Sequence, residues 1–72
     1  MKRYKTNDGV VVKVGDYVMD ALFGEGYVIT DITDELIYMD ELEYNEDIDD
    51  YEKNGAERKL TPAEFNNKIM FY

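Results

Sequence analysis

The chain of 72 residues carries a net charge of −9 and contains no cysteine, histidine, serine or tryptophan. The side chains on which most nucleophilic catalysis depends are missing, so we expect a protein that is not an enzyme and that needs no cofactor or metal. This length suits one domain, placed at 1–72, with a core that is small for its surface. No apolar run approaches the length of a membrane span and no secretory leader is recognisable, so we expect a cytoplasmic protein.

The charges are distributed unevenly along the chain. Residues 16–52 contain fourteen carboxylates and no lysine or arginine, whereas both flanking segments are slightly basic. A negative field of this kind repels nucleic acid and attracts basic protein surfaces. We therefore expect a basic protein partner, no direct binding of nucleic acid and no membrane contact. A hydrophobic content of 44% separates the chain from disordered acidic proteins, so it should fold.

Short strands separated by turns are expected over the first forty residues. The strands are predicted at 10–14, 17–19, 27–32 and 36–39, from β-branched and alternating apolar residues. Turns are predicted at Asn7-Asp8-Gly9, at Gly15-Asp16 and at 23–26, where Gly24 and Gly26 permit a positive φ.

The next segment alternates between apolar and acidic residues. Leu42 and Tyr44 are interleaved with Glu41 and Glu43, which predicts a strand with one face that can pack and one that carries acid. Further on, Lys53-Asn54-Gly55 predicts a hairpin with a type I′ turn, followed by a short strand that ends at Leu60.

A helical turn is predicted after Leu60. Thr61 is an N-cap candidate, Pro62 suits the first helical position, and Glu64 completes a capping box. Phe65 and Ile69 lie four residues apart and would form the apolar side of the helix. Five short strands with glycine turns and one small helix predict a mainly β protein, either a compact barrel or a strongly bent sheet.

One stretch resembles a known family. Residues 15–18 and 23–28 match eight positions of the pattern GDxVxxxxFGEGxV, which is typical of the Tudor-like, SH3-type barrel at the C-terminal end of bacterial repair helicases. CarD-type RNA-polymerase-interacting domains show a weaker version. Lys59-Leu60, Phe65 and Ile69 are similar to the closing segment of the helicase module. The resemblance implies a small SH3/Tudor-like five-stranded barrel that binds proteins and has no activity of its own.

The acidic segment at 40–52 has three possible interpretations. It could be a solvated loop without a partner. It could be an ordered surface that imitates a phosphate backbone, because carboxylates two apart on a strand recur about every 6.6 Å on one face. It could also bind a cation through Asp47, Asp49, Asp50 and Glu52, although an EF-hand's spacing and glycine are missing. The candidate binding residues are the carboxylates Asp40, Glu41, Glu43, Glu46, Asp47, Asp49 and Asp50, with Tyr44 and Tyr51 as aromatic anchors.

The aromatic residues fall into two groups. Tyr17, Phe23, Tyr27 and Phe65 are expected to fill the core. Tyr38, Tyr44 and Tyr51 are interleaved with acids and could be core or contact residues, because tyrosine is enriched at binding hot spots.

Two functional hypotheses follow. The first is a non-catalytic acidic protein that binds a basic, nucleic-acid-handling protein and inhibits or modulates it as a DNA or phosphate mimic, by analogy with viral and mobile-element inhibitors of host defence or repair. The alternative is an SH3/Tudor-like adaptor that contacts RNA polymerase or helicase machinery through its aromatic and apolar edge, with Phe23, Tyr27 and Tyr38 as contacts.

Overall fold

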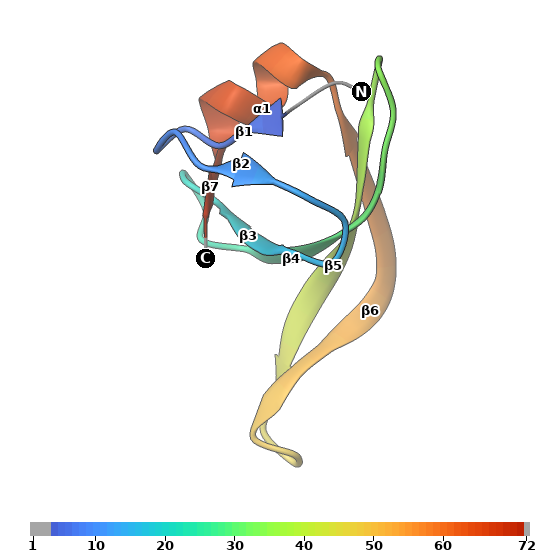
Figure 1. The fold of residues 1–72 in the computed structure, drawn as a ribbon. Helices are drawn as coiled ribbons and strands as arrows, with labels where there is room; N and C mark the ends of the chain where they lie inside the picture. The colour runs from blue at the N-terminus through green and yellow to red at the C-terminus, as the bar shows by residue number, and fades with distance from the viewer. Residues whose placement is uncertain (1–3, 72) are drawn as a thin grey trace.

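The computed structural model describes residues 4–71, which form two antiparallel sheets and one helix (Figure 1). The smaller sheet pairs β1 (Tyr4–Lys5) with β2 (Val11–Val12). The larger sheet has the strand order β6-β5-β4-β3-β7. Its members are β3 (Tyr17–Asp20), β4 (Gly26–Ile32), β5 (Ile37–Asn45), β6 (Asp50–Leu60) and β7 (Ile69–Phe71), with helix α1 (Pro62–Lys68) between the last two. The predicted mainly β fold with a short C-terminal helix is confirmed.

The larger sheet is open. In the described part of the chain, β6 and β7 form its two edges and no ladder joins them, so a closed five-stranded barrel is not present. The chain leaves β6 through α1, which carries it to the opposite edge, where β7 pairs with β3. The helix and the smaller sheet lie together over one end of the larger sheet (Figure 1).

Most of the core lies between the inner face of the larger sheet, the smaller sheet and α1. Val18, Ile29, Ile37, Met39 and Ile69 are essentially inaccessible to solvent. Phe65 of α1 is also buried in this core, and its ring meets the ring of Tyr4 edge to face, with 5.9 Å between ring centroids. Tyr27, Val12 and Leu60 complete this cluster.

The core prediction is wrong for two of the four aromatic residues assigned to it. Tyr27 and Phe65 are buried, but Phe23 is 74% exposed and Tyr17 is 56% exposed. Phe23 lies in the turn between β3 and β4, beyond the end of the sheet. Tyr17 precedes the buried Val18 in β3, and the period of two along a strand turns its side chain to the outer face.

The helix begins as the sequence predicts. The Thr61 hydroxyl accepts a hydrogen bond from the Glu64 amide at 3.3 Å, and the Glu64 carboxylate accepts one from the Thr61 amide at 3.2 Å. This reciprocal capping box satisfies two amides that have no partner within the helix. The single buried residue of α1 is Phe65, so the box fixes the segment that delivers this ring to the core.

The Asn54-Gly55 pair does not form the predicted hairpin turn. β5 pairs with β6 on both sides of it, and Asn54, Gly55 and Ala56 form a bulge opposite Glu41. Gly55 has a φ of 89°, and the Asn54 side chain accepts a hydrogen bond from the Ala56 amide at 2.9 Å. A type I′ turn needs a positive φ at both central residues, but only Gly55 of this pair has one, and the pair forms a bulge within a strand instead. The hairpin turn lies at 46–49, where Asp49 takes a φ of 52°.

The hairpin of β5 and β6 makes the molecule elongated, with principal extents of 39 × 20 × 15 Å. Its distal half reaches beyond the helix and the smaller sheet (Figure 1). Within residues 4–71, no helix has the length and apolar character needed to cross a membrane.

Candidate functional site

The candidate site is the projecting β5–β6 hairpin, which has two chemically different faces. In β5 the odd-numbered residues continue the inner face of Ile37 and Met39, and the even-numbered residues lie on the outer face. The predicted two-faced strand is confirmed in this respect. The inner face of β5 is apolar at Ile37 and Met39, where it packs on the core, and becomes acidic at Glu41 and Glu43, which lie beyond the core.

The acidic face consists of Glu41, Glu43 and Glu52. Glu43 and Glu52 are direct partners in the strand ladder, so two carboxylates face each other across the hairpin. Like charges in this position are destabilising, and within residues 4–71 no ion pair reaches either of them. The Asn45 side chain donates a 2.9 Å hydrogen bond to Glu52, which holds that carboxylate in place without neutralising it.

The aromatic face consists of Tyr17, Leu42, Tyr44 and Tyr51. Tyr44 and Tyr51 are ladder partners, and their rings meet edge to face with 5.4 Å between centroids. The Tyr44 hydroxyl donates a hydrogen bond to Asp49, which raises the pKa of the phenol. Tyr44 and Tyr51 are 48% and 47% exposed, so the pair forms an ordered part of the hairpin surface.

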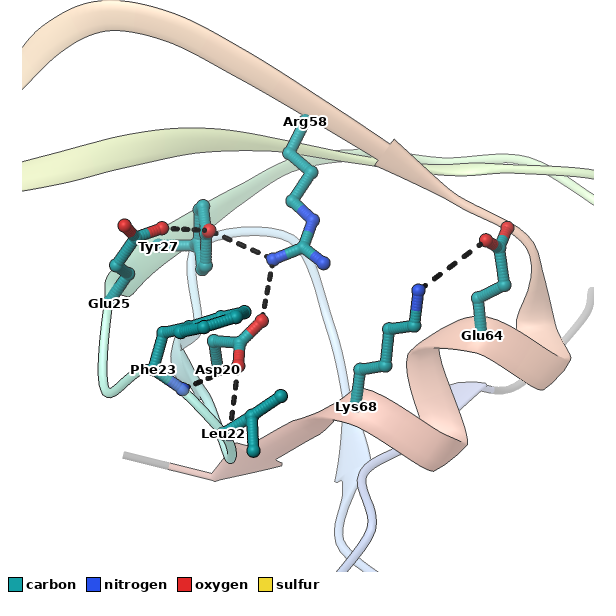
Figure 2. A network of polar contacts seen from close by, with 8 residues as sticks. All are labelled: Asp20, Leu22, Phe23, Glu25, Tyr27, Arg58, Glu64 and Lys68. Carbon is teal, nitrogen blue, oxygen red and sulfur yellow. Dashed lines mark hydrogen bonds and ion pairs between the residues drawn. The ribbon is translucent and has the colours of Figure 1, made fainter.

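At the root of the hairpin lies a polar network that joins β6 to β3 (Figure 2). The Arg58 guanidinium donates hydrogen bonds to the Asp20 carboxylate at 2.8 Å and to the Tyr27 hydroxyl at 2.9 Å. Tyr27 in turn donates to Glu25 at 2.9 Å. The second Asp20 oxygen accepts bonds from the Leu22 and Phe23 amides at 2.8 and 2.9 Å, which closes the turn between β3 and β4.

This network has a clear electrostatic balance. Burial of Asp20, which is only 2% exposed, tends to raise its pKa, but the bonds from Arg58 and from the two amides outweigh that effect and lower it. Burial also raises the pKa of Tyr27, and its bond to Glu25 acts in the same direction. Asp20 is therefore a structural anion with its own cation, and it is not available to an external partner.

An open depression of about 450 Å³ adjoins this network. Its lining residues are Phe23, Glu25, Tyr27, Glu41, Glu57 and Arg58. Glu25 lies in the β3–β4 turn with its carboxylate bonded to Tyr27, whereas Glu57 is the ladder partner of Asp40 and so shares the outer-face register. The sequence alone does not predict this grouping, because the lining residues come from the β3–β4 turn, β4, β5 and β6.

The structure separates the predicted site residues into three groups. Glu41 and Glu43 lie on the acidic face, whereas Tyr44 and Tyr51 lie on the opposite face. Asp40 is on the outer side and forms an ion pair with Lys53 at 3.1 Å. The remaining predicted carboxylates, Glu46, Asp47, Asp49 and Asp50, lie in or beside the turn at the tip.

The residues of the alternative adaptor surface do not form one patch. Phe23 is exposed in the β3–β4 turn, whereas Tyr27 is buried on the inner face. Tyr38 is half-buried on the outer face, with the Lys59 ammonium 5.8 Å from its ring centre. Of the three, only Phe23 offers a large free surface.

The cation-site interpretation finds no geometric support. Across residues 4–71, no group of three or more acidic side chains is arranged so that it could hold a metal ion. Asp49 is engaged by the Tyr44 hydroxyl, and Asp50 accepts a bond from the Tyr51 amide at 2.8 Å.

Comparison of the chain with models of known protein families, with characterised proteins and with solved structures found no match.

Proposed function

We propose that the protein is a non-catalytic acidic module that binds a basic surface of a nucleic-acid-handling protein and inhibits or modulates it by presenting carboxylates in place of phosphates. The observation that carries the proposal is the Glu43–Glu52 pair on a projecting hairpin, two opposed carboxylates to which no ion pair is made within residues 4–71. Such a pair costs stability in the free protein, and a basic partner would remove that cost.

Three further features support a phosphate mimic. Glu41 and Glu43 are two apart on one strand and so recur at about 6.6 Å, close to the phosphate spacing along one nucleic-acid strand. Backbone pairing in the hairpin keeps them in fixed register. Glu25 lines the same depression as Glu41, so a further carboxylate lies between the acidic face and the body of the domain. By size and charge, a viral or mobile-element inhibitor of host defence or repair is the kind of protein that this arrangement suits.

The test is affinity capture from a cell lysate followed by competition. The triple variant Glu41→Gln, Glu43→Gln, Glu52→Gln keeps the side-chain shapes and removes three charges. A matched control changes Asp31, Asp34 and Glu35, which are exposed and lie outside the hairpin, to their amides. A captured protein should be lost with the first variant and kept with the control, should elute with moderate salt, and should be displaced by duplex DNA.

The proposal fails if the captured protein is retained equally by both variants or resists displacement by DNA. Retention by both variants together with loss on Phe23→Ser would instead favour the second candidate, the SH3/Tudor-like adaptor for polymerase or helicase machinery. One observation favours that candidate: Leu22 and Phe23, adjacent in the β3–β4 turn, are 82% and 74% exposed. Exposed apolar patches are typical of interaction sites.

A further inference from the structure

The outer face of the larger sheet contains a hollow that the polar chemistry of the hairpin does not explain. It has a volume of about 260 Å³ and is lined by Tyr17, Gly26, Leu42, Asp50 and Tyr51. Gly26 pairs with Leu42 on one side and with Met19 on the other, so it lies in the interior of the sheet. Because Gly26 has no side chain, space remains between the side chains of Tyr17, Leu42 and Tyr51.

The backbone does not require glycine at position 26. The other four glycines of the chain have a positive φ, whereas Gly26 does not. A Cβ atom built on Gly26 would meet only the Leu42 side chain, at 3.8 Å, which is ordinary van der Waals contact. Glycine inside a strand weakens it and often marks a place where another molecule approaches closely. The glycine that leaves the hollow open therefore lowers the stability of the sheet.

We infer that this hollow, which we call the Gly26 hollow, receives an apolar side chain from a basic segment of the partner protein. The inference rests on the proposed function and adds an anchoring site on the face opposite to the acidic one. The walls are apolar and aromatic, as expected of a pocket for a hot-spot side chain. Asp50 is one of its lining residues, and the acidic turn at 46–49 directly precedes Asp50 in the chain, so positive residues beside the apolar one would be attracted.

A second copy of the same chain is a poor occupant. Each copy carries a net charge of −9, and the tip next to the hollow holds Glu46, Asp47 and Asp49. Bringing two such tips together is opposed by like-charge repulsion, whereas a lysine- or arginine-rich segment is complementary in charge.

The test uses three blocked pentapeptides as probes. One has leucine between two pairs of lysines, one has alanine in its place, and one has leucine between two pairs of glutamates. Binding is followed by NMR titration of the amide signals of the intact protein. The lysine–leucine peptide should shift the signals of Gly26, Leu42 and Tyr51, and replacing its leucine by alanine should weaken binding at least about fivefold, because the buried apolar area is lost. The glutamate peptide should not bind.

Two variants test the site itself. Gly26→Val fills the hollow and should reduce the affinity for the lysine–leucine peptide to that of the lysine–alanine peptide, without changing the latter. Tyr17→Ala removes an exposed wall without touching the core and should act in the same direction. Leu22→Ala, at an exposed apolar residue outside the hollow, is the control and should change nothing.

Each other outcome overturns a defined part of the argument. Equal binding of both lysine peptides by all variants would refute the hollow and leave the acidic surface intact. No binding of any lysine peptide would count against both the hollow and the proposed function. Binding of the glutamate peptide would refute a basic occupant. Self-association that Gly26→Val abolishes would assign the hollow to a second copy.

Discussion

Arg58 on β6 donates a 2.8 Å hydrogen bond to the buried carboxylate of Asp20 on β3, although β5 and β4 lie between these strands in the sheet. In a flat sheet the two strands would be about 14 Å apart. The contact therefore requires the sheet to curl around its inner face, and it ties the root of the acidic hairpin to the turn that carries Phe23. The hairpin is held in its orientation by this pair.

Replacing Asp20 by asparagine should destabilise the protein by about 2–3 kcal/mol, because Arg58 loses its anionic partner in a largely buried position. The measurement is the free energy of unfolding in urea at pH 7. Arg58→Met, which leaves the Asp20 charge unpaired, should cost a comparable amount. An effect below about 0.5 kcal/mol for both variants, the range of ordinary surface changes, would contradict the structural role of the pair.

Stability should fall in acid. The folded pKa of Asp20 is lowered from its ordinary value of 3.8, as burial is outweighed by Arg58 and the turn amides. A carboxylate with a lowered folded pKa stabilises the fold above its unfolded pKa, and this contribution is lost as the pH falls through the folded value. Asp8, Asp16 and Glu64 have lowered pKa values as well. Unfolding measured between pH 7 and pH 2 should show little change above about pH 5 and a decline below about pH 4. Asp20→Asn should show a smaller decline.

Glu43→Gln should stabilise the free protein by about 0.2–1 kcal/mol at low salt, because it removes one of two opposed carboxylates while Asn45 still holds Glu52. Thermal melts at low and high salt are the measurement, and the gain should shrink as salt screens the wild-type repulsion. Glu35→Gln, outside the hairpin, is the matched control and should have a smaller effect. A loss of stability in Glu43→Gln would show that this carboxylate has a favourable contact.

Gly26→Ala and Gly55→Ala should act in opposite directions. Gly26 has no positive φ and space for a Cβ atom, so alanine should stabilise the strand by about 0.4–1 kcal/mol. Gly55 has a φ of 89° in the β6 bulge, so alanine there should destabilise by about 1 kcal/mol or more. Chemical unfolding of both variants against wild type decides this. A destabilised Gly26→Ala would mean that the fold itself needs this glycine.

Phe23→Ala and Phe65→Ala offer a second matched comparison. Phe23 is exposed, and its loss should change the unfolding free energy by less than about 0.5 kcal/mol. Phe65 is fully buried against Tyr4, and its loss should cost about 3–5 kcal/mol, enough to unfold much of a domain this small. Circular dichroism melts distinguish the two. Similar melts would contradict the burial that separates these residues.

Local signals in the sequence were sufficient where the chemistry is local. Thr61, Pro62 and Glu64 predict the helix start correctly, because a capping box involves only residues three apart. The alternation at 41–45 correctly predicts a strand with two different faces, since side-chain direction follows from the period of two. The absence of lysine and arginine from 16–52 predicts an acidic surface, and the candidate segment at 40–52 lies within it.

Only the tertiary structure decided which strand residues pair with each other. Asn54-Gly55 has the local preference of a hairpin turn, but its partner strand continues past it, so the same positive φ appears as a bulge. The bulge leaves Glu57 opposite Asp40, and beyond it strand pairing sets Glu43 against Glu52 and Tyr44 against Tyr51. Such contacts depend on register between distant segments, which composition and periodicity do not determine. The sequence therefore determined which segment is acidic and extended, and the folded sheet decided which of its side chains share a face.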